Sequence, residues 1–349
     1  KRELQMKGIT EQLEQGVKEL FTSEMYTEYL RTMSQFHNYS FNNTLLIAMQ
    51  KPDATLVAGY QAWQKKFKRQ VRRGEKAIQI IAPAPIREKQ EVEKIDPETQ
   101  EPVLRFDGQP ETEEVEIVIP RFRVASVFDI SQTDGEPLPE LETPELMGSV
   151  ENFKVFMKAV QEVSPVPVRF DEISSGAKGY YSNTEKEIVI QNGMSESQTM
   201  KTGIHEVTHA MLHDRDFMEE QGEKKNQMTK EVEAESVAYT VCQYFGLDTS
   251  DYSFPYIAGW SSSMDMKELR TSMDTIRKTA GSFIDSMTEV IQRLMREQPE
   301  LSLSAMKQAE ILIDRVEQER TLFSGEERNL LVNYAYKFDN AEETEKLIR

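Results

Sequence analysis

The pattern His-Glu-x-x-His at residues 205–209 is the feature that most constrains how this chain can fold. Residues four apart lie on one face of an α-helix, so in a helix His205 and His209 can both direct an imidazole nitrogen at one metal ion. Glu206 then lies beside them, where its carboxylate can accept a proton from a water molecule at the metal. The chain has four histidines, and three of them fall within residues 205–213. We therefore predict a helix with a zinc site and with Glu206 as the catalytic base.

A zinc ion bound by two histidines needs a third protein ligand and one open position. The next predicted helix, residues 230–245, begins with three glutamates at alternate positions. Glu231 and Glu235 are four apart and share a face, so Glu231 is the predicted third ligand and Glu235 is expected to accept an imidazole N–H of a ligand histidine. The reverse assignment, with Glu235 on the metal, stays open. Glu233 points elsewhere, and His213 is interpreted as a structural histidine, with a role behind the ligands or as an outer ligand as the alternatives.

Charge is distributed unevenly along the chain. The 42 basic and 60 acidic residues give a formal charge of −18, which disfavours nucleic-acid binding over the whole surface. Residues 51–89, however, hold ten basic and three acidic residues, a local net charge of +7. Aromatic rings within such a cationic run can stack on bases while the cations pair with phosphates, as single-stranded nucleic-acid binding requires. The predicted DNA-binding residues are Tyr60, Trp63, Lys65, Lys66, Lys68, Arg69, Arg72 and Arg73. The alternative is that Trp63 belongs to a core and that the cations form a solvated face.

Segments of contrasting composition predict an α+β protein of two domains. Residues 1–130 mix helices and strands and are expected to form the first domain, in which the acidic stretch 88–114 is interpreted as a mobile insertion between two hairpin strands. The acidic, proline-bearing residues 131–149 are the predicted linker. Residues 150–262 are the predicted second domain with the metal helices, and residues 263–349 are a predicted helical C-terminal region.

Composition also excludes several classes of protein. The single cysteine, Cys242, rules out a disulfide framework and a zinc ribbon made of cysteines alone. No run of about 18 apolar residues is present, so no membrane-spanning helix is expected. Because the sequence shows no apolar signal core, a cytoplasmic location is expected.

The order of several motifs in the first domain resembles a known family. The motifs are Tyr-Ser-Phe-Asn-Asn-Thr-Leu-Leu-Ile at 39–47, Ala-Gly-Tyr-Gln-Ala-Trp at 58–63 and Val-Arg-Arg-Gly-Glu-Lys-Ala-Ile at 71–78. Together they are similar to the N-terminal domain of ArdC-type antirestriction proteins. In that family the domain binds single-stranded DNA and a zincin-like domain follows it. The resemblance covers roughly residues 10–260.

The second domain resembles zincin metallopeptidases of the gluzincin type, in which a helix after the His-Glu-x-x-His helix supplies a glutamate ligand. Its motifs are also similar to those of ImmA/IrrE-like peptidases. The strand at 187–190 then resembles the edge strand along which such enzymes lay an extended substrate. The resemblance implies a gluzincin-like fold, peptide-bond hydrolysis by a metal-activated water, and often a tyrosine or histidine that stabilises the oxyanion at the reacting carbonyl. Tyr239, Tyr252 and Tyr256 are alternatives for that tyrosine.

These resemblances predict a zinc-dependent, metallopeptidase-like protein of a mobile genetic element. It is expected to bind single-stranded DNA and to act in antirestriction during conjugative transfer. Its expected partners are single-stranded DNA and an unidentified protein or peptide substrate. Two alternatives stay open: a regulatory zinc protease that cleaves a repressor, and a DNA-binding shield without catalysis whose zinc is structural. Whether the chain is an active enzyme is also left open.

Overall fold

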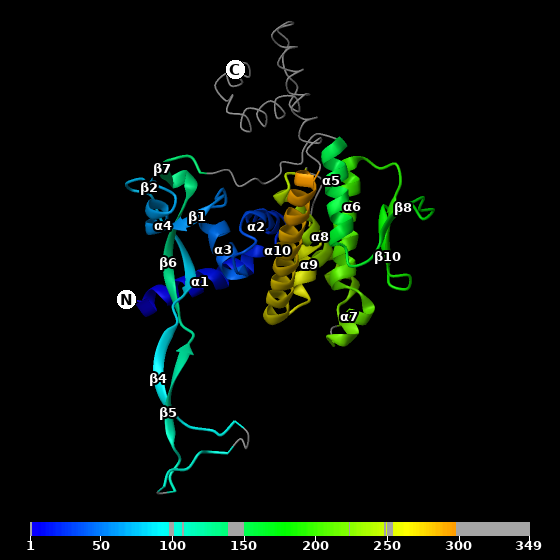
Figure 1. Cartoon of the computed structure of the whole chain (residues 1–349). Coiled ribbons are helices and arrows are strands. Elements are labelled where there is room, and N and C mark those ends of the chain that lie inside the picture. The colour runs from blue at the N-terminus through cyan, green and yellow to red at the C-terminus, as the bar shows by residue number, and fades with distance from the viewer. Residues whose placement is uncertain are drawn as a thin grey trace. The chain divides into compact units, whose positions relative to one another are not determined.

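The computed structural model describes residues 2–97, 101–106, 108–138, 150–222, 224–247, 249 and 254–297. The chain forms two compact units, one of residues 1–20 and 42–137 and one of residues 21–41 and 138–349. Both units mix helices with strands, which confirms the predicted α+β class (Figure 1). No helix in the described part of the chain is both long and apolar enough to cross a membrane. The predicted linker from residue 139 and the C-terminal region from residue 298 lie outside the described residues.

The first unit is built on an antiparallel three-stranded sheet of order β1-β6-β3. Its strands are β1 (Val57–Gly59), β6 (Phe122–Asp129) and β3 (Ile78–Pro83). The unit also contains the helices α1 (Arg2–Leu20), α3 (Phe41–Gln50) and α4 (Tyr60–Lys65) and the strand pair β2 (Arg69–Val71) and β7 (Thr133–Gly135). Ile78, Ile80 and Val127 of the sheet are buried, which is typical of an antiparallel sheet with one face on a core.

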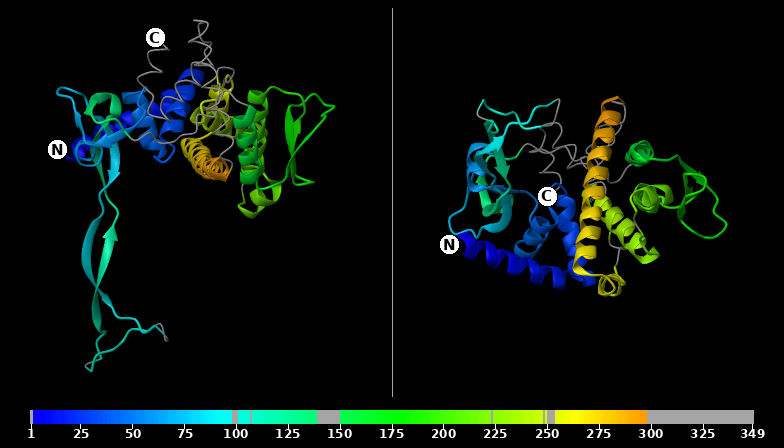
Figure 2. Two further views of the ribbon diagram at one scale, coloured as in Figure 1. Left: turned by 45° about the horizontal axis from the view of Figure 1, so that its top comes forward. Right: turned by 90° about the horizontal axis from the view of Figure 1, so that it is seen from below.

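Two longer strands, β4 (Ile86–Glu93) and β5 (Thr112–Ile119), pair as an antiparallel ribbon that projects beyond the three-stranded sheet (Figures 1 and 2). The insertion predicted between two hairpin strands over 88–114 therefore has the wrong bounds, because β4 runs on to Glu93 and β5 begins at Thr112. Charged residues that suggested a solvated loop stabilise the strand pairing instead, because they form ion pairs across it. These pairs are Arg87 with Glu116 at 3.1 Å and Lys89 with Glu114 at 2.8 Å.

The predicted linker, 131–149, begins too early, because the 3-10 helix η1 (Ile130–Gln132) and β7 belong to the first unit. Asp129 is fully buried and begins η1 with a capping box. Its second carboxylate oxygen accepts the backbone N–H groups of Thr55 and Leu56 at 2.8 and 3.0 Å. This buried carboxylate ties the end of β6 to the segment before β1.

The second unit contains a small mixed sheet of order β8-β10-β9. Its strands are β8 (Val168–Asp171), β10 (Glu187–Gln191) and β9 (Gly179–Ser182). The prediction that residues 187–190 form an edge strand was wrong, because β10 pairs with β8 in parallel and with β9 in antiparallel. Its unbroken apolar run, Ile188 to Ile190, is buried, as befits a central strand. β8 and β9 are the edges.

The helices of the second unit are α2 (Ser23–Gln35), α5 (Val150–Val163), α6 (Glu196–Leu212), α7 (Arg215–Glu220), α8 (Gln227–Tyr244), α9 (Ile257–Ser262) and α10 (Met266–Glu297). Helix α8 packs against α6, α10 and α2. The predicted first domain ran without a break to residue 130, whereas residues 21–41 group with this second unit. On α2, the Tyr26 hydroxyl hydrogen-bonds the Ser236 hydroxyl of α8 at 2.8 Å, and both residues are fully buried.

Candidate metal centre

Two features of α6 position its histidines. Ser195 caps the helix and accepts the backbone N–H of Gln198 at 3.3 Å, as the sequence predicted for the start of this helix. Ile204 and Val207 are fully buried and form the apolar side of the helix. His205 and His209 lie in α6 and His213 is its C-cap residue. Their four-residue spacing brings the three rings into line, with neighbouring ring centroids 4.7 and 5.1 Å apart.

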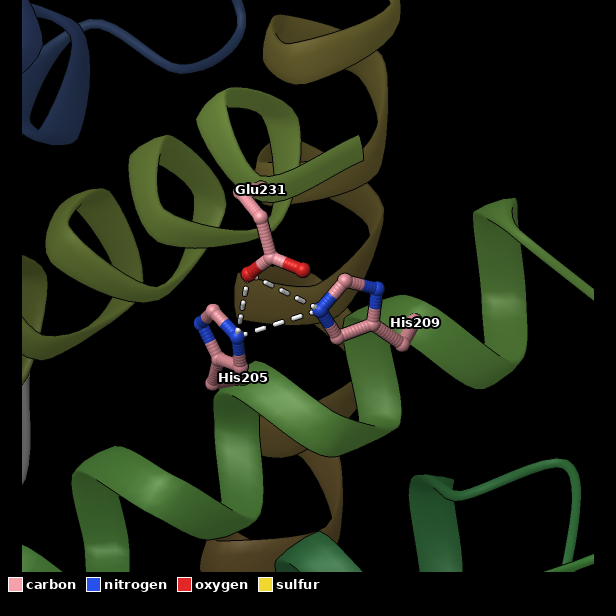
Figure 3. Close-up of side chains that lie close together, drawn as sticks. All are labelled: His205, His209 and Glu231. Atoms are coloured by element: carbon pink, nitrogen blue, oxygen red, sulfur yellow. Dashed lines mark hydrogen bonds and ion pairs between the residues drawn. The ribbon is translucent and has the colours of Figure 1, made fainter. Parts of the chain in front are cut away.

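The predicted ligands His205, His209 and Glu231 lie together, each with one nitrogen or oxygen atom within 4.8 Å of the others (Figure 3). The two Nε2 atoms are 3.1 Å apart, and a Glu231 oxygen lies 3.5 Å from the first and 3.6 Å from the second. A metal ion about 2.0–2.2 Å from each of its tetrahedrally arranged ligand atoms holds those atoms about 3.3 Å apart. The three donor atoms therefore have the spacing that a bound ion requires. Two imidazoles and a carboxylate also form a donor set that zinc and similar divalent ions accept.

Glu235 lies behind one of these histidines, where the sequence placed it. Its carboxylate oxygen is 3.1 Å from Nδ1 of His205, on the ring side away from the cluster. When Nδ1–H donates to this carboxylate, the Nε2 lone pair is free for a metal. The geometry favours Glu231 over Glu235 as the third ligand, because only Glu231 approaches both histidine Nε2 atoms.

Hydrogen bonds within the cluster shift the pKa values of His205 and Glu231 in opposite directions. Burial lowers the pKa of His205, but hydrogen bonds with Glu231 and Glu235 outweigh it and raise the pKa to about 10. The Glu231 pKa is held well below its usual range by hydrogen bonds with His205 and His209. A metal ion at this cluster competes with protons on the histidines, so metal binding must release protons.

Glu206 is nearly buried beside the cluster and is not one of the three converging ligands. Burial raises the pKa of its carboxyl above the ordinary value, against the opposing charges of His205 and His209. Strand β9 approaches this carboxylate through a residue without a side chain. A Cβ on Gly179 would lie 2.6 Å from Thr202 Cγ2 and 3.2 Å from Glu206 Cγ. The raised pKa and the enclosed position suit a carboxylate that exchanges a proton with water.

Sequence reasoning missed a buried group behind the second histidine. His213 Nδ1 lies 2.9 Å from His209 Nδ1, and His213 Nε2 lies 3.0 Å from a Glu233 oxygen. Glu233 is fully buried and also accepts from Lys225 Nζ at 3.0 Å and from the Ser272 hydroxyl at 2.5 Å. The only signal for this group in the sequence was His213, one helical turn beyond the ligands.

Among the tyrosines considered for the reacting carbonyl, Tyr239 is buried against Phe254, and their ring centroids are 5.9 Å apart. Tyr256 is 71% exposed. Tyr252 lies outside the described residues.

The predicted DNA-binding residues of the first unit occupy different environments. Trp63 is fully buried, and its indole N–H donates to the Phe128 carbonyl at 2.8 Å. This corrects the prediction for Trp63, which is a core residue with no ring face for a base. Tyr60, at 48% exposed, does present its ring at the surface. Arg69 donates to the Thr133 hydroxyl and carbonyl, so its guanidinium holds β7 in place.

The other predicted cations lie at the surface. Arg72 pairs with Glu75 at 2.8 Å, which occupies part of its guanidinium. The remaining exposed cations are Lys65, Lys66, Lys68 and Arg73. Lys68 lies 3.4 Å from Glu136, whereas the other three form no ion pair with any residue that the structure describes. The side chains of Lys65, Lys66 and Arg73 are therefore accessible to the phosphates of a nucleic acid.

Comparison with known proteins finds similarity to a described family in the first part of the chain. Residues 2–128 match the family model of the N-terminal domain of anti-restriction factor ArdC. The uncharacterized protein pXO2-81 of Bacillus anthracis is 29% identical over 297 residues, which cover 77% of this chain and 49% of that protein. The chain thus spans about half the length of this curated relative.

Two crystal structures of the antirestriction protein ArdC from plasmid R388 are also similar. The metal-free structure has a TM-score of 0.43 and 22% identity, and the match covers 73% of this chain and 86% of that one. The Mn(II)-bound structure has a TM-score of 0.43 and 20% identity, with 72% and 85% covered. The match to the family model thus makes residues 2–128 of this chain similar to ArdC N-terminal domains and does not extend to the rest of the chain.

Proposed function

We propose that this chain is an ArdC-type antirestriction protein of a mobile genetic element. In this proposal an N-terminal domain that binds single-stranded DNA precedes a zincin-like, zinc-dependent metallopeptidase domain. The observation that carries the enzymatic part is the convergence of His205, His209 and Glu231, with the Glu206 carboxylate beside them. The helix pair α6 and α8, next to a small sheet, supports a gluzincin-like arrangement of this site.

The donor set supports zinc as the ion, because two imidazoles and a carboxylate leave a fourth position open in a tetrahedral site. One of the R388 ArdC structures holds Mn(II), so the experiment below must also identify which ion this chain binds. When bound, such an ion supplies Lewis-acid polarisation of a carbonyl oxygen and makes water more acidic.

The residues of the chain supply the remaining chemistry. Glu206 accepts a proton from water and passes it to the amine that leaves when a peptide bond is cleaved. Its burial supports this role, because burial raises the pKa of the carboxyl and so makes its carboxylate a stronger base. An extended peptide can pair with the free edge of β9, the strand whose Gly179 lies against Glu206.

The metal site is tested by measuring bound metal in the purified full chain by mass spectrometry. We expect about one divalent ion per chain in the wild type and loss of that ion in His205→Ala/His209→Ala. His37→Ala is the matched control, because His37 is the fourth histidine and lies outside the cluster. A wild-type protein without metal, or a double variant that keeps its metal, would contradict the ligand assignment.

Catalysis is tested separately with Glu206→Gln, which keeps the shape of the side chain and removes its basicity. We expect this variant to bind metal and DNA normally and to lose hydrolysis of peptide or protein substrates. It should also lose protection of transferred DNA against restriction. If protection is unchanged in Glu206→Gln, the metal is structural and the chain acts as a shield.

The DNA-binding part is supported by the family match and by the exposed side chains of Tyr60, Lys65, Lys66 and Arg73. Phosphate contacts make the affinity for single-stranded DNA fall steeply with salt concentration. Replacing the three cations with alanine should weaken binding and reduce that salt dependence. The matched control replaces three exposed lysines of the second unit, which are Lys154, Lys158 and Lys267. Equal losses in both triple variants would refute a local DNA surface.

A further inference from the structure

A line of buried hydrogen bonds runs from the candidate metal centre into the protein. It leads from His209 through His213 to Glu233, with separations of 2.9 and 3.0 Å. His213 is 3% exposed, and Glu233 is 0% exposed. The other two contacts of Glu233 are with Lys225 and Ser272, so its carboxylate has donors on three sides.

The order of donors and acceptors along this line is fixed by chemistry. A neutral imidazole carries one N–H and one acceptor nitrogen, whereas an ionised carboxylate only accepts. Glu233 therefore requires the His213 proton on Nε2, which leaves His213 Nδ1 as an acceptor. That acceptor in turn requires the His209 proton on Nδ1. The Nε2 lone pair of His209, which faces His205 and Glu231, is then free to bind a metal.

Removing the carboxylate would remove this constraint. His213 could then carry its proton on Nδ1 and donate it to His209, which would place the His209 proton on Nε2 and block the metal. Burial of Glu233 fits this reading, because a fully buried carboxylate is destabilising unless several donors pair with it. An apolar residue of similar size would fill the same space without orienting an imidazole.

We infer that His213 and Glu233 are positioning residues that fix His209 in the tautomer and orientation needed to bind the metal. This inference rests on the proposed function. Each ligand histidine then has its own carboxylate. Glu235 acts on His205 directly at 3.1 Å, and Glu233 acts on His209 through His213. Lys225 and Ser272 hold the Glu233 carboxylate in place.

The test compares metal affinity in full-length variants by competition with a chromophoric chelator, using Zn²⁺ and Co²⁺. We expect His213→Leu and Glu233→Met to raise the metal Kd about 10–100-fold, the usual loss when a group behind a ligand histidine is removed. The absorption spectrum of bound Co²⁺ should also change, because it reports the geometry of the ligands. His213→Gln should recover most of the affinity, since its amide can accept from His209 and donate to Glu233.

Ser236→Ala is the matched control, because it removes a buried hydrogen bond of α8 that does not involve the metal centre. Its thermal stability should fall while its metal Kd stays unchanged. An unchanged Kd and an unchanged Co²⁺ spectrum in His213→Leu would overturn the inference alone. If that variant does not fold, the same readings on Glu233→Met decide, and failure of His213→Gln to recover affinity counts against the relay. A wild-type protein that binds no metal would overturn the proposed function and this inference together.

Discussion

The close approach of β9 to α6 predicts that Gly179→Ala destabilises the second unit. The added Cβ would lie 2.6 Å from Thr202 Cγ2 and 3.2 Å from the Val189 carbonyl oxygen. The Val189 carbonyl belongs to the central strand β10 and cannot move without disturbing its pairing with β9. Overpacking a tight site in this way destabilises by about 1–3 kcal/mol. In a unit of this size that corresponds to a lower Tm by about 2–12 °C.

A double-mutant cycle identifies the atom responsible. Thr202→Ser deletes the Cγ2 methyl group and keeps the hydroxyl, which accepts from the Gln198 amide at 3.2 Å. Alone, this deletion of a buried methyl destabilises by about 1 kcal/mol. In Gly179→Ala/Thr202→Ser, the alanine methyl enters the space left by Cγ2, so the double variant should be more stable than the sum of the single changes predicts.

The measurement is thermal and urea unfolding of the four proteins with a metal chelator present, so that differences in metal affinity do not contribute. A Gly179→Ala protein within about 0.5 kcal/mol of the wild type would refute the predicted overlap. Strictly additive effects in the cycle would show that the added methyl group does not clash with Thr202 Cγ2. Either result would also weaken the argument that β9 lies against Glu206.

Three further expectations concern other parts of the chain. Trp63→Phe leaves the half-buried Phe128 carbonyl without the indole donor and should lower the free energy of unfolding by about 1–3 kcal/mol in urea titrations, with little change in the salt slope of DNA binding. Burial raises the pKa of Asp214, but hydrogen bonds from Lys186 and Tyr181 hold it well below the usual range. Its stabilising contribution is thus complete at pH 7 and is lost as pH falls below about 4, so unfolding of Asp214→Asn and wild type should differ at pH 7 and converge in acid. Zn²⁺ at 100 times its Kd should stabilise the wild type by about 2.7 kcal/mol over the chelated protein, and His205→Ala/His209→Ala should show no such rise in Tm by scanning calorimetry.

Helical spacing, together with the need of zinc for a third protein ligand, was enough to predict which residues form the metal centre. His205, His209, Glu231 and Glu235 were placed by the rule that residues four apart share a face, and the structure brings all four together. The rule works here because both helices are regular over the relevant turns. It fixes which side chains share a face, without reference to the rest of the fold.

Glu233 could not be found in the same way. A glutamate near the start of an acidic helix is normally solvated, and its burial depends on α10, whose Ser272 lies 39 residues further along the chain. Trp63 was misplaced for a related reason. An aromatic residue within a basic run fits both a core and a stacking surface, and only the contact with Phe128 of β6 decides between them. Tertiary packing, which local patterns do not encode, determined both outcomes.

The membership of α2 in the second unit limits how this protein can be divided. The chain passes from one unit to the other after residues 20, 41 and 137, so neither unit is a single continuous stretch of sequence. A fragment ending near residue 130 would keep α2 but lose α8, against which α2 packs. The buried Tyr26 would then lose its contacts with Ser236 and Phe254. A recombination event that exchanged only the first 130 residues would therefore also replace α2, which packs against α8 in the second unit. This favours inheritance of the two units as a pair.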